Sequence, residues 1–459
     1  MVKKYAEWIV RWRWLVLLAT LASVFLIGSG GKRLQFTNDY RVFFSEENPQ
    51  LKAFDNLQET YTKNDNVLFM LLPRSGEVFT PDVLEAVVEL TEQSWQVPYS
   101  IRVDSISNFQ NTYAEEDDLI VADLVENPET LTPADLEKIA NTALNEPLLR
   151  NRLISPDRHA TGINITIELP GKNPTTEVPE VVTSVRSMIA TMEKKYPQIE
   201  FYTTGVVMMN NAFPEASIGD MSSLVPMAFA AIIISLLFFL RTFWGTVAAI
   251  IVVIFSIMMA MGSTGWLGIK LTPPSASAPT MILTLAIADS IHFLATMLFQ
   301  MRQGMTRQEA VVESMRINFH PIFLTSLTTA VGFLSMNFSD APPFRDLGNI
   351  TAMGVSYAFI LSVTFLPALL SVLPIKTSSA QSKASKFMDN FAEFVIRRRT
   401  TLLWGVGALI IVLVALIPRN EINDTFVEYF DETIQFRQHT DKVADNLTGL
   451  YFIDYSLDS

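Results

Sequence analysis

Long hydrophobic runs alternate with long polar stretches along this chain of 459 residues. Six of the runs carry no charged residue, and a seventh is interrupted by a single acid, Asp289. The runs cover residues 14–31, 221–240, 242–269, 271–301, 318–339, 347–375 and 400–418. A helix of roughly 18 to 25 apolar residues can cross the roughly 30 Å hydrocarbon core of a bilayer. The pattern therefore predicts an α-helical polytopic membrane bundle with seven spans.

The polar segment after the first run, residues 32–220, has the pattern of an α+β domain. Strand patterns cover residues 66–72, 101–106, 161–169 and 199–204, and helix patterns cover residues 80–96 and 175–196. The resulting order, β-α-β-β-α-β, is that of the ferredoxin-like split unit. An insertion at residues 107–156 holds a predicted helix at 133–144 and an acidic run at 115–118. We expect that run to be a solvated loop rather than a cation site.

Basic residues indicate how the chain is oriented in the membrane. They cluster before the first run, between alternate later runs, and before the last run: Lys3, Lys4, Arg11, Arg13, Arg241, Arg302, Arg307, Arg316, Lys376, Lys383, Lys386 and Arg397 to Arg399. The opposite short loops carry only Lys270 and Arg345. By the positive-inside rule, the N-terminus is cytoplasmic and residues 32–220 lie outside. On the cytoplasmic side, the capping-box spacing of Thr306 and Glu309 predicts a short helix ending near Ile317.

Two stretches of the chain repeat each other at an offset of 386 residues. Residues 6–11 (AEWIVR) return as residues 392–397 (AEFVIR), in both cases just before a hydrophobic run. Matching polar residues follow each of the two runs. Chance similarity is the alternative, but the polar flanks of two spans need not resemble each other. We therefore expect a duplicated protein, of which this sequence holds the first copy and the start of the second.

The repeat and the runs together predict six segments. They are a cytoplasmic N-terminus with the first span (1–31), an extracytoplasmic domain (32–220), a five-helix bundle (221–375), a cytoplasmic Ser-rich linker (376–399), a seventh span (400–418) and the start of a second extracytoplasmic domain (419–459). Basic residues before the first run and small residues after it also fit a signal peptide. Because the repeat has an equivalent run, we expect the first span to be retained.

Composition excludes several classes of function. The net charge of −13 argues against a nucleic-acid partner. The chain has no cysteine and four histidines, which excludes disulfides and cysteine-ligated metals, and we expect neither a metal nor a cofactor. Around Gly31 and Lys32, Leu26 and Arg33 stand where a phosphate-binding loop needs Gly and Ser or Thr. No enzyme motif is present, so we expect a protein that is not an enzyme and draws on an ion gradient.

Asp289 is the strongest candidate for chemistry, because it lies well inside the fourth predicted span. A charged residue at that depth costs at least about 2.5 kcal/mol, so it should face the bundle interior and have a function. His292 follows at the i+3 position, where a helix places both side chains on one face. An imidazole and a carboxyl so placed can exchange a proton. We therefore predict a proton or cation relay at Asp289, with His292 either taking part or packing as a structural residue.

Hydroxyl side chains form a second candidate group. Thr325, Thr328 and Thr329 lie in the fifth span with Gly332 and Ser335 at helical spacing, and Ser290 directly follows Asp289. Small hydroxylated faces let membrane helices pack closely. The same hydroxyls could instead line a proton or water path beside Asp289. The spacing leaves both interpretations open.

The chain resembles the resistance-nodulation-division (RND) superfamily, specifically its MMPL-type lipid exporters. The Patched and Niemann-Pick type proteins are similar in their sterol-sensing bundle. The resemblance covers the whole chain, and its sharpest parts are residues 288–293 (ADSIHF) and 324–333 (LTSLTTAVGF). It implies that Asp289 is the acid of the proton relay in the fourth span. The chain departs from the family pattern at Ala286 and Ala288, where Gly is common, and at Ser290, where Tyr or a second acid is common.

The resemblance also implies a function. We expect a proton-motive-force-driven exporter, a proton antiporter that moves lipids or other hydrophobic molecules across a bacterial inner membrane. The extracytoplasmic part would be a porter domain, and the protein would be a homo-oligomer, a dimer or a trimer, with periplasmic partners. The family's relay partner of Asp289 lies in a tenth span, outside this sequence. The alternatives are a lipid- or sterol-sensing receptor and an accessory subunit of protein translocation.

Overall fold

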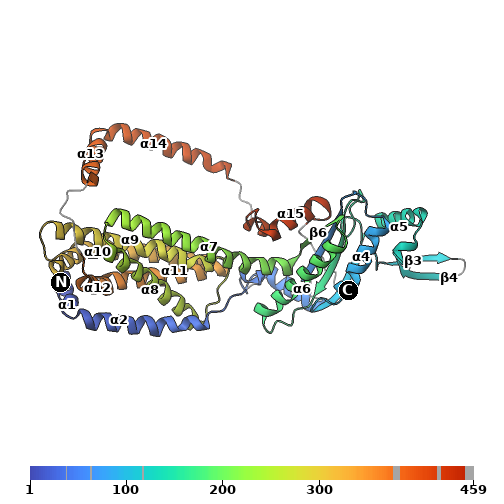
Figure 1. The fold of residues 1–459 in the computed structure, drawn as a ribbon, viewed down its shortest axis with the longest axis horizontal. Coiled ribbons are helices and arrows are strands. Elements are labelled where there is room, and N and C mark those ends of the chain that lie inside the picture. The colour runs from blue at the N-terminus through green and yellow to red at the C-terminus, as the bar shows by residue number, and fades with distance from the viewer. Residues whose placement is uncertain (38, 62–64, 116–117, 376–382, 421–424, 450–459) are drawn as a thin grey trace.

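The computed structural model describes the chain apart from residues 38, 62–64, 116–117, 376–382, 421–424 and 450–459. A bundle of long helices forms one end of the molecule, and a β-sheet with its own helices forms the other (Figure 1). Within the described residues, seven helices are long and apolar enough to cross a membrane. The chain is therefore a multi-pass membrane protein, which confirms the interpretation of the hydrophobic runs.

Each of the seven helices corresponds to one predicted run. They are α2 (Arg13–Gly28), α7 (Val206–Leu240), α8 (Phe243–Leu267), α9 (Ala278–Arg302), α10 (Arg307–Leu334), α11 (Pro342–Val363) and α14 (Arg399–Leu416). The span of α11 continues, after a break at Thr364, as α12 (Phe365–Val372). Helices α8, α9 and α11 bury about half of their apolar windows or more, so they form the centre of the bundle.

Two of these helices begin well before their hydrophobic runs. Helix α7 starts at Val206, in polar sequence, because a helix continues wherever its backbone hydrogen bonds continue. Helix α10 starts at Arg307 behind the predicted capping box of Thr306 and Glu309. The prediction of a separate short helix ending near Ile317 was wrong, because α10 passes through Pro321 without a break. One proline removes a single N–H donor, which a helix packed in a bundle tolerates.

Glycines bring two backbones of the bundle into contact. The turn η1 (Ser29–Arg33) continues α2 and crosses α8. A Cβ atom on Gly262 would lie 2.1 Å from the carbonyl oxygen of Ile27, and one on Gly265 would lie 2.0 Å from that of Gly30. Any larger side chain at these positions would have to push the helices apart.

The other end of the molecule is built on a four-stranded antiparallel sheet. Its strands are β1 (Asn66–Pro73), β2 (Ser100–Ser105), β5 (Thr161–Ile167) and β6 (Ile199–Thr204). They lie in the order β2-β5-β1-β6. Helix α4 (Pro81–Ser94) packs against β2 and β5, and α6 (Pro174–Lys195) packs against β6. Fully buried side chains from the two central strands, Phe69, Ile163 and Ile165, form the middle of this core.

The insertion between β2 and β5 is more ordered than we predicted. Strands β3 (Gln110–Glu115) and β4 (Asp118–Asp123) pair as an antiparallel hairpin that projects from the sheet domain (Figure 1). The acidic run expected to be a loop therefore contributes Glu115 and Asp118 to the paired strands, while residues 116–117 lie outside the described part. Aromatic and β-branched residues on both sides of the run, Thr112 and Tyr113 before it and Ile120 and Val121 after it, favour the hairpin. The predicted helix of the insertion is α5 (Pro133–Asn145).

A single residue, Gly205, joins the sheet to the bundle. It follows β6 directly and precedes α7, and its φ of 113° is one that side chains other than hydrogen rarely permit. A Cβ atom there would lie 2.5 Å from the carbonyl oxygen of Asn66. The Asn66 side chain also accepts a hydrogen bond from the N–H of Val206 (3.2 Å). The start of α7 is therefore fixed to the central strand β1.

The sequence repeat returns as a structural repeat. Helix α1 (Val2–Arg11) precedes α2, and α13 (Lys383–Arg397) precedes α14. Further along, η2 (Tyr40–Phe43) matches η7 (Phe426–Tyr429), and α3 (Pro49–Thr60) matches α15 (Gln435–Asn446), both pairs at the offset of 386 residues. Most of the predicted linker is thus helix α13, because residues 383–397 repeat the amphipathic pattern of α1. Residues 376–382 of the linker lie outside the described residues.

Helix α15 of the second copy packs on the sheet of the first. It lies beside the edge strand β6 (Figure 1). The backbone N–H of Thr203 donates to Nδ1 of His439 (3.1 Å), and the hydroxyls of Thr204 and Thr440 lie 2.8 Å apart. Burial lowers the pKa of His439, and the nearby charge of Arg186 lowers it further. The neutral imidazole can therefore accept the hydrogen bond that the sheet edge offers.

Candidate functional site

Asp289 lies at the middle of α9, 11 residues after the helix begins at Ala278. Its side chain is 6% exposed, and apolar neighbours on the same helix, Ala286 and Phe293, are fully buried. Asp289 therefore lies inside the bundle, as its position in the hydrophobic run predicts. A carboxylate in such surroundings is held in its charged form only by the polar groups that reach it.

Ser326 of α10 provides such a group. Its hydroxyl donates a hydrogen bond to Oδ2 of Asp289 at 3.0 Å, and the Ser326 side chain is itself buried. None of the ion pairs formed by the described residues includes Asp289. One hydroxyl therefore joins the acid of α9 to the neighbouring helix, and no basic side chain lies within ion-pair distance of it in the part of the chain that the structure describes.

The two predicted neighbours of Asp289 on α9 lie in different surroundings. His292 is exposed on the bundle surface, and no hydrogen bond joins it to Asp289 among the described residues. Ser290 is fully buried, and its hydroxyl points back to the carbonyl oxygen of Ala286 (3.4 Å). The i+3 spacing thus places His292 near the acid, without a hydrogen bond or an ion pair between the two side chains.

The predicted threonines of α10 face mainly away from Asp289. Thr325 and Thr328 are exposed and donate to carbonyl oxygens of their own helix, those of Pro321 and Leu324 (both 2.9 Å). Thr329 is half-buried. The hydroxyl that contacts the acid is the one between them, Ser326, which our sequence reasoning missed.

A signal for Ser326 does exist in the sequence. The buried side of α10 includes Ser314, Asn318, Ile322 and Ser326, each four residues from the next. The hydroxyl of Ser314 also donates across to α9, to the carbonyl oxygen of Phe293 (2.7 Å). Small and polar residues at this spacing mark the side of α10 that packs on α9, whereas the run of threonines drew attention to the opposite side.

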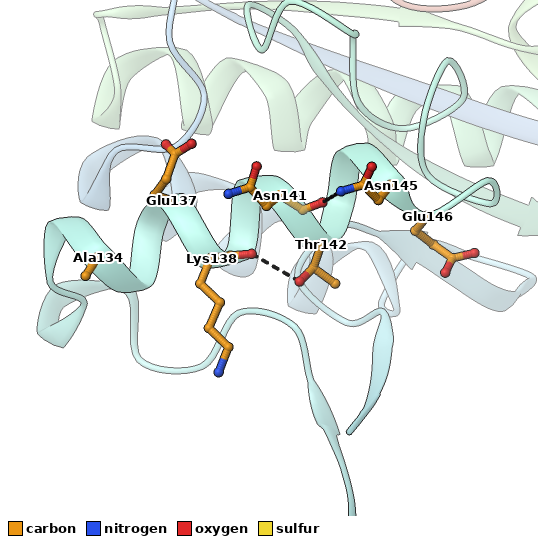
Figure 2. Close-up of a pocket in the computed structure, with 7 residues that line it drawn as sticks. All are labelled: Ala134, Glu137, Lys138, Asn141, Thr142, Asn145 and Glu146. Atoms are coloured by element: carbon orange, nitrogen blue, oxygen red, sulfur yellow. Dashed lines mark hydrogen bonds between the residues drawn. The ribbon is translucent and has the colours of Figure 1, made fainter. Parts of the chain in front are cut away.

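A shallow hollow runs along α5, lined by residues of that helix and by Glu146 at its end, with Thr142 and Asn145 donating to the backbone one turn earlier (Figure 2). Among the described residues, no group of three or more His, Cys, Asp or Glu side chains could hold a metal ion. The buried acid between α9 and α10 is therefore the candidate site.

Comparison with known proteins places this site in a family context. A sequence model of the MMPL family matches residues 49–411, which include α9 and α10. Among curated proteins, a Methanocaldococcus jannaschii protein whose name says only that it is a membrane protein is 22% identical over 380 residues. That match covers 81% of this chain and 93% of the relative.

Two relatives with transport functions match over shorter regions. The mycolic acid-containing lipids exporter MmpL11 of Mycolicibacterium smegmatis is 21% identical over 268 residues, 56% of this chain and 28% of the exporter. The hopanoid transporter HpnN of Rhodopseudomonas palustris is 35% identical over 66 residues, 14% of this chain and 8% of the transporter. The chain thus matches less than a third of either transporter's length.

Proposed function

The chain belongs to the MMPL family, and from that premise we propose that it is a proton-motive-force-driven exporter of lipids or other hydrophobic molecules. The names of two relatives, an exporter of mycolic acid-containing lipids and a hopanoid transporter, support a lipid as the substrate class. The exporter acts as a proton antiporter in a bacterial inner membrane, with a cytoplasmic N-terminus. It is a transporter and not an enzyme.

The observation that carries this proposal is the burial of Asp289 with one hydroxyl bonded to it and no ion pair among the described residues. A carboxyl so placed is stable when protonated and costly when charged, so protonation changes the free energy of the surrounding packing. Ser326 donates to the charged carboxylate, while a protonated carboxyl can itself donate. Protonation therefore changes the contact between α9 and α10. This contact can supply the two conformations between which a transporter must switch.

The extracytoplasmic part completes the proposal. We assign its four-stranded sheet, with strand order β2-β5-β1-β6 and helices α4 and α6, as a ferredoxin-like porter domain. Packing of α15 on β6 supports a porter assembled from both copies of the repeat. The proposed partners are membrane lipids, protons, further copies of the chain in a dimer or trimer, and periplasmic proteins.

The test is the flux of lipid and of protons in liposomes that hold the full-length protein. Asp289→Asn keeps the size of the side chain and removes its proton, and Thr328→Val removes an exposed hydroxyl of α10 as the matched control. We expect both fluxes to vanish with Asp289→Asn and to persist with Thr328→Val at equal insertion. If Asp289→Asn transports like wild type, Asp289 is structural, and a lipid sensor or an accessory translocation subunit becomes the better interpretation.

A further inference from the structure

Two buried hydroxyls of α11 lack the hydrogen bond that most hydroxyls of the bundle make. Ser256, Thr264 and Ser356 each donate to the carbonyl oxygen four residues earlier in their own helix. Thr351 and Ser362 have no exposed surface, and the hydroxyl of each has no hydrogen-bond partner among the described residues. Because a buried unpaired hydroxyl is costly, these two groups call for a polar ligand.

Three contacts fix how α11 is rotated in the bundle. Gly354 faces α9, Gly348 faces α10, and Tyr357 faces α8. The groups that these residues meet are the side chain of Ile282, the carbonyl oxygen of Phe333 and the hydroxyl of Ser263. An α-helix turns by about 100° per residue. Viewed along the axis of α11, Gly348 therefore lies about 120° from Gly354 in one direction of rotation, and Tyr357 lies about 60° from Gly354 in the opposite direction.

The two unpaired hydroxyls lie on the side of α11 that faces both α9 and α10. By the same rotation, Thr351 and Ser362 lie about 60° and about 80° from Gly354 toward Gly348. That direction points between the two helices that Asp289 and Ser326 connect. Four buried polar side chains from three helices therefore lie along one seam.

The depths of these groups place Ser362 beside Asp289 and Thr351 about 15 Å from it along the helices. Helices α9 and α11 run in the same direction, because α10 returns between them. Asp289 lies seven residues beyond Ile282, about 10.5 Å, and Ser362 lies eight residues beyond Gly354, about 12 Å. Thr351 lies about 4.5 Å on the other side of the same contact. Ser362 is thus nearly level with Asp289, and Thr351 is nearer the start of α11.

We propose that α9, α10 and α11 enclose a water-binding seam in which Thr351 and Ser362 hold the water molecules that carry protons to and from Asp289. Each hydroxyl can both donate and accept, and a buried water needs two to four such partners. The inference rests on the proposed function, and it names the residues that connect the acid to water. They are positioning residues, since they act through the waters they hold.

The test compares proton flux in liposomes that hold the full-length protein. One variant, Thr351→Val with Ser362→Ala, removes both hydroxyls, and a second, Thr351→Ser with Ser362→Thr, keeps them. Ser356→Ala is the matched control on the same helix, since its hydroxyl already bonds to the carbonyl oxygen of Ala352 (2.8 Å). Reaction of Asp289 with a lipid-soluble carbodiimide shows whether the carboxyl is still in place.

We expect removal of both hydroxyls to reduce proton flux by about tenfold or more, with the carbodiimide reaction retained. The hydroxyl-keeping variant and Ser356→Ala should stay within about twofold of wild type. Equal loss of flux in the hydroxyl-removing and hydroxyl-keeping variants would overturn the seam. Normal proton flux in the variant without both hydroxyls would also overturn the seam. If Asp289→Asn loses its flux in that case, the proposed function still stands. Normal flux in Asp289→Asn would overturn both.

Discussion

A methyl group added at Gly262 should destabilise the bundle by forcing α8 away from the end of α2. Its carbon would lie 2.1 Å from the carbonyl oxygen of Ile27 and 2.6 Å from Cα of Gly28. Non-bonded atoms prefer separations of about 3.5 Å, so the helices must separate by roughly 1 Å. Overpacking of this kind costs about 1–3 kcal/mol, and the cost is at the upper end here because the obstacle is backbone. Alanine regains up to about 1 kcal/mol in helix propensity, which leaves a net loss of about 2 kcal/mol.

The measurement is the free energy of unfolding of the purified protein in detergent, for Gly262→Ala against wild type. Gly332 of α10 is the matched control, because a Cβ atom there would meet nothing within 4 Å. Gly332→Ala should leave stability unchanged or raise it by up to about 1 kcal/mol. If Gly262→Ala is as stable as Gly332→Ala, the close approach of α8 to α2 is not part of the folded bundle.

Two further predictions concern single hydrogen bonds. Ser326→Ala removes the hydrogen bond to Asp289. Loss of about 1.4 kcal/mol at a buried carboxylate should slow proton-coupled export about tenfold in liposomes. Thr325→Ala changes the exposed side of the same helix and should have no effect. Acidification should release α15 from β6. The pKa of His439 is lowered from the ordinary histidine value of 6.5. The contact therefore contributes its full stability above about pH 6.5 and weakens as the pH falls below that value. Hydrogen exchange at the N–H of Thr203 should therefore accelerate between about pH 7 and about pH 5, after correction for intrinsic rates. His439→Asn, which offers a non-titrating acceptor in a similar place, should show no such change.

The spans were predictable because the bilayer imposes both a length and an absence of charge. The same rule says nothing about a helix outside the apolar region, which is why the polar start of α7 at Val206 was missed and the first turns of α10 were predicted as a separate helix. The strands of the sheet were found from alternation, and β6 begins and ends at the predicted residues. The hairpin in the insertion was missed because its acidic tip resembles a solvated loop more than a strand end.

The site was predictable only in part, for a similar reason. Asp289 stands out because a single charge in an apolar run is conspicuous whatever the fold. Ser326 does not stand out, since α10 contains several hydroxyls and the sequence alone does not say which side of the helix meets α9. The same holds for Thr351 and Ser362, whose lack of a partner depends on the rotation of α11 against two other helices. The chemical role of a residue can be predicted from its position in one span. Which side chains contact one another depends on how neighbouring helices are rotated about their axes.

Because a single residue, Gly205, joins α7 to the sheet, a tilt of α7 is transmitted directly to the sheet. The helix has 35 residues, so it is about 52 Å long, and about 20 Å of it extends beyond the hydrocarbon core. A tilt of about 5° about its inner end would carry the outer end sideways by about 4.5 Å. Because β1 and β6 are fixed to that end, the sheet must travel with it. Bending is easiest at Pro214 and Pro226, where the helix lacks a backbone donor. Small rearrangements between helices in the membrane would thus be amplified into displacement of a whole domain outside it.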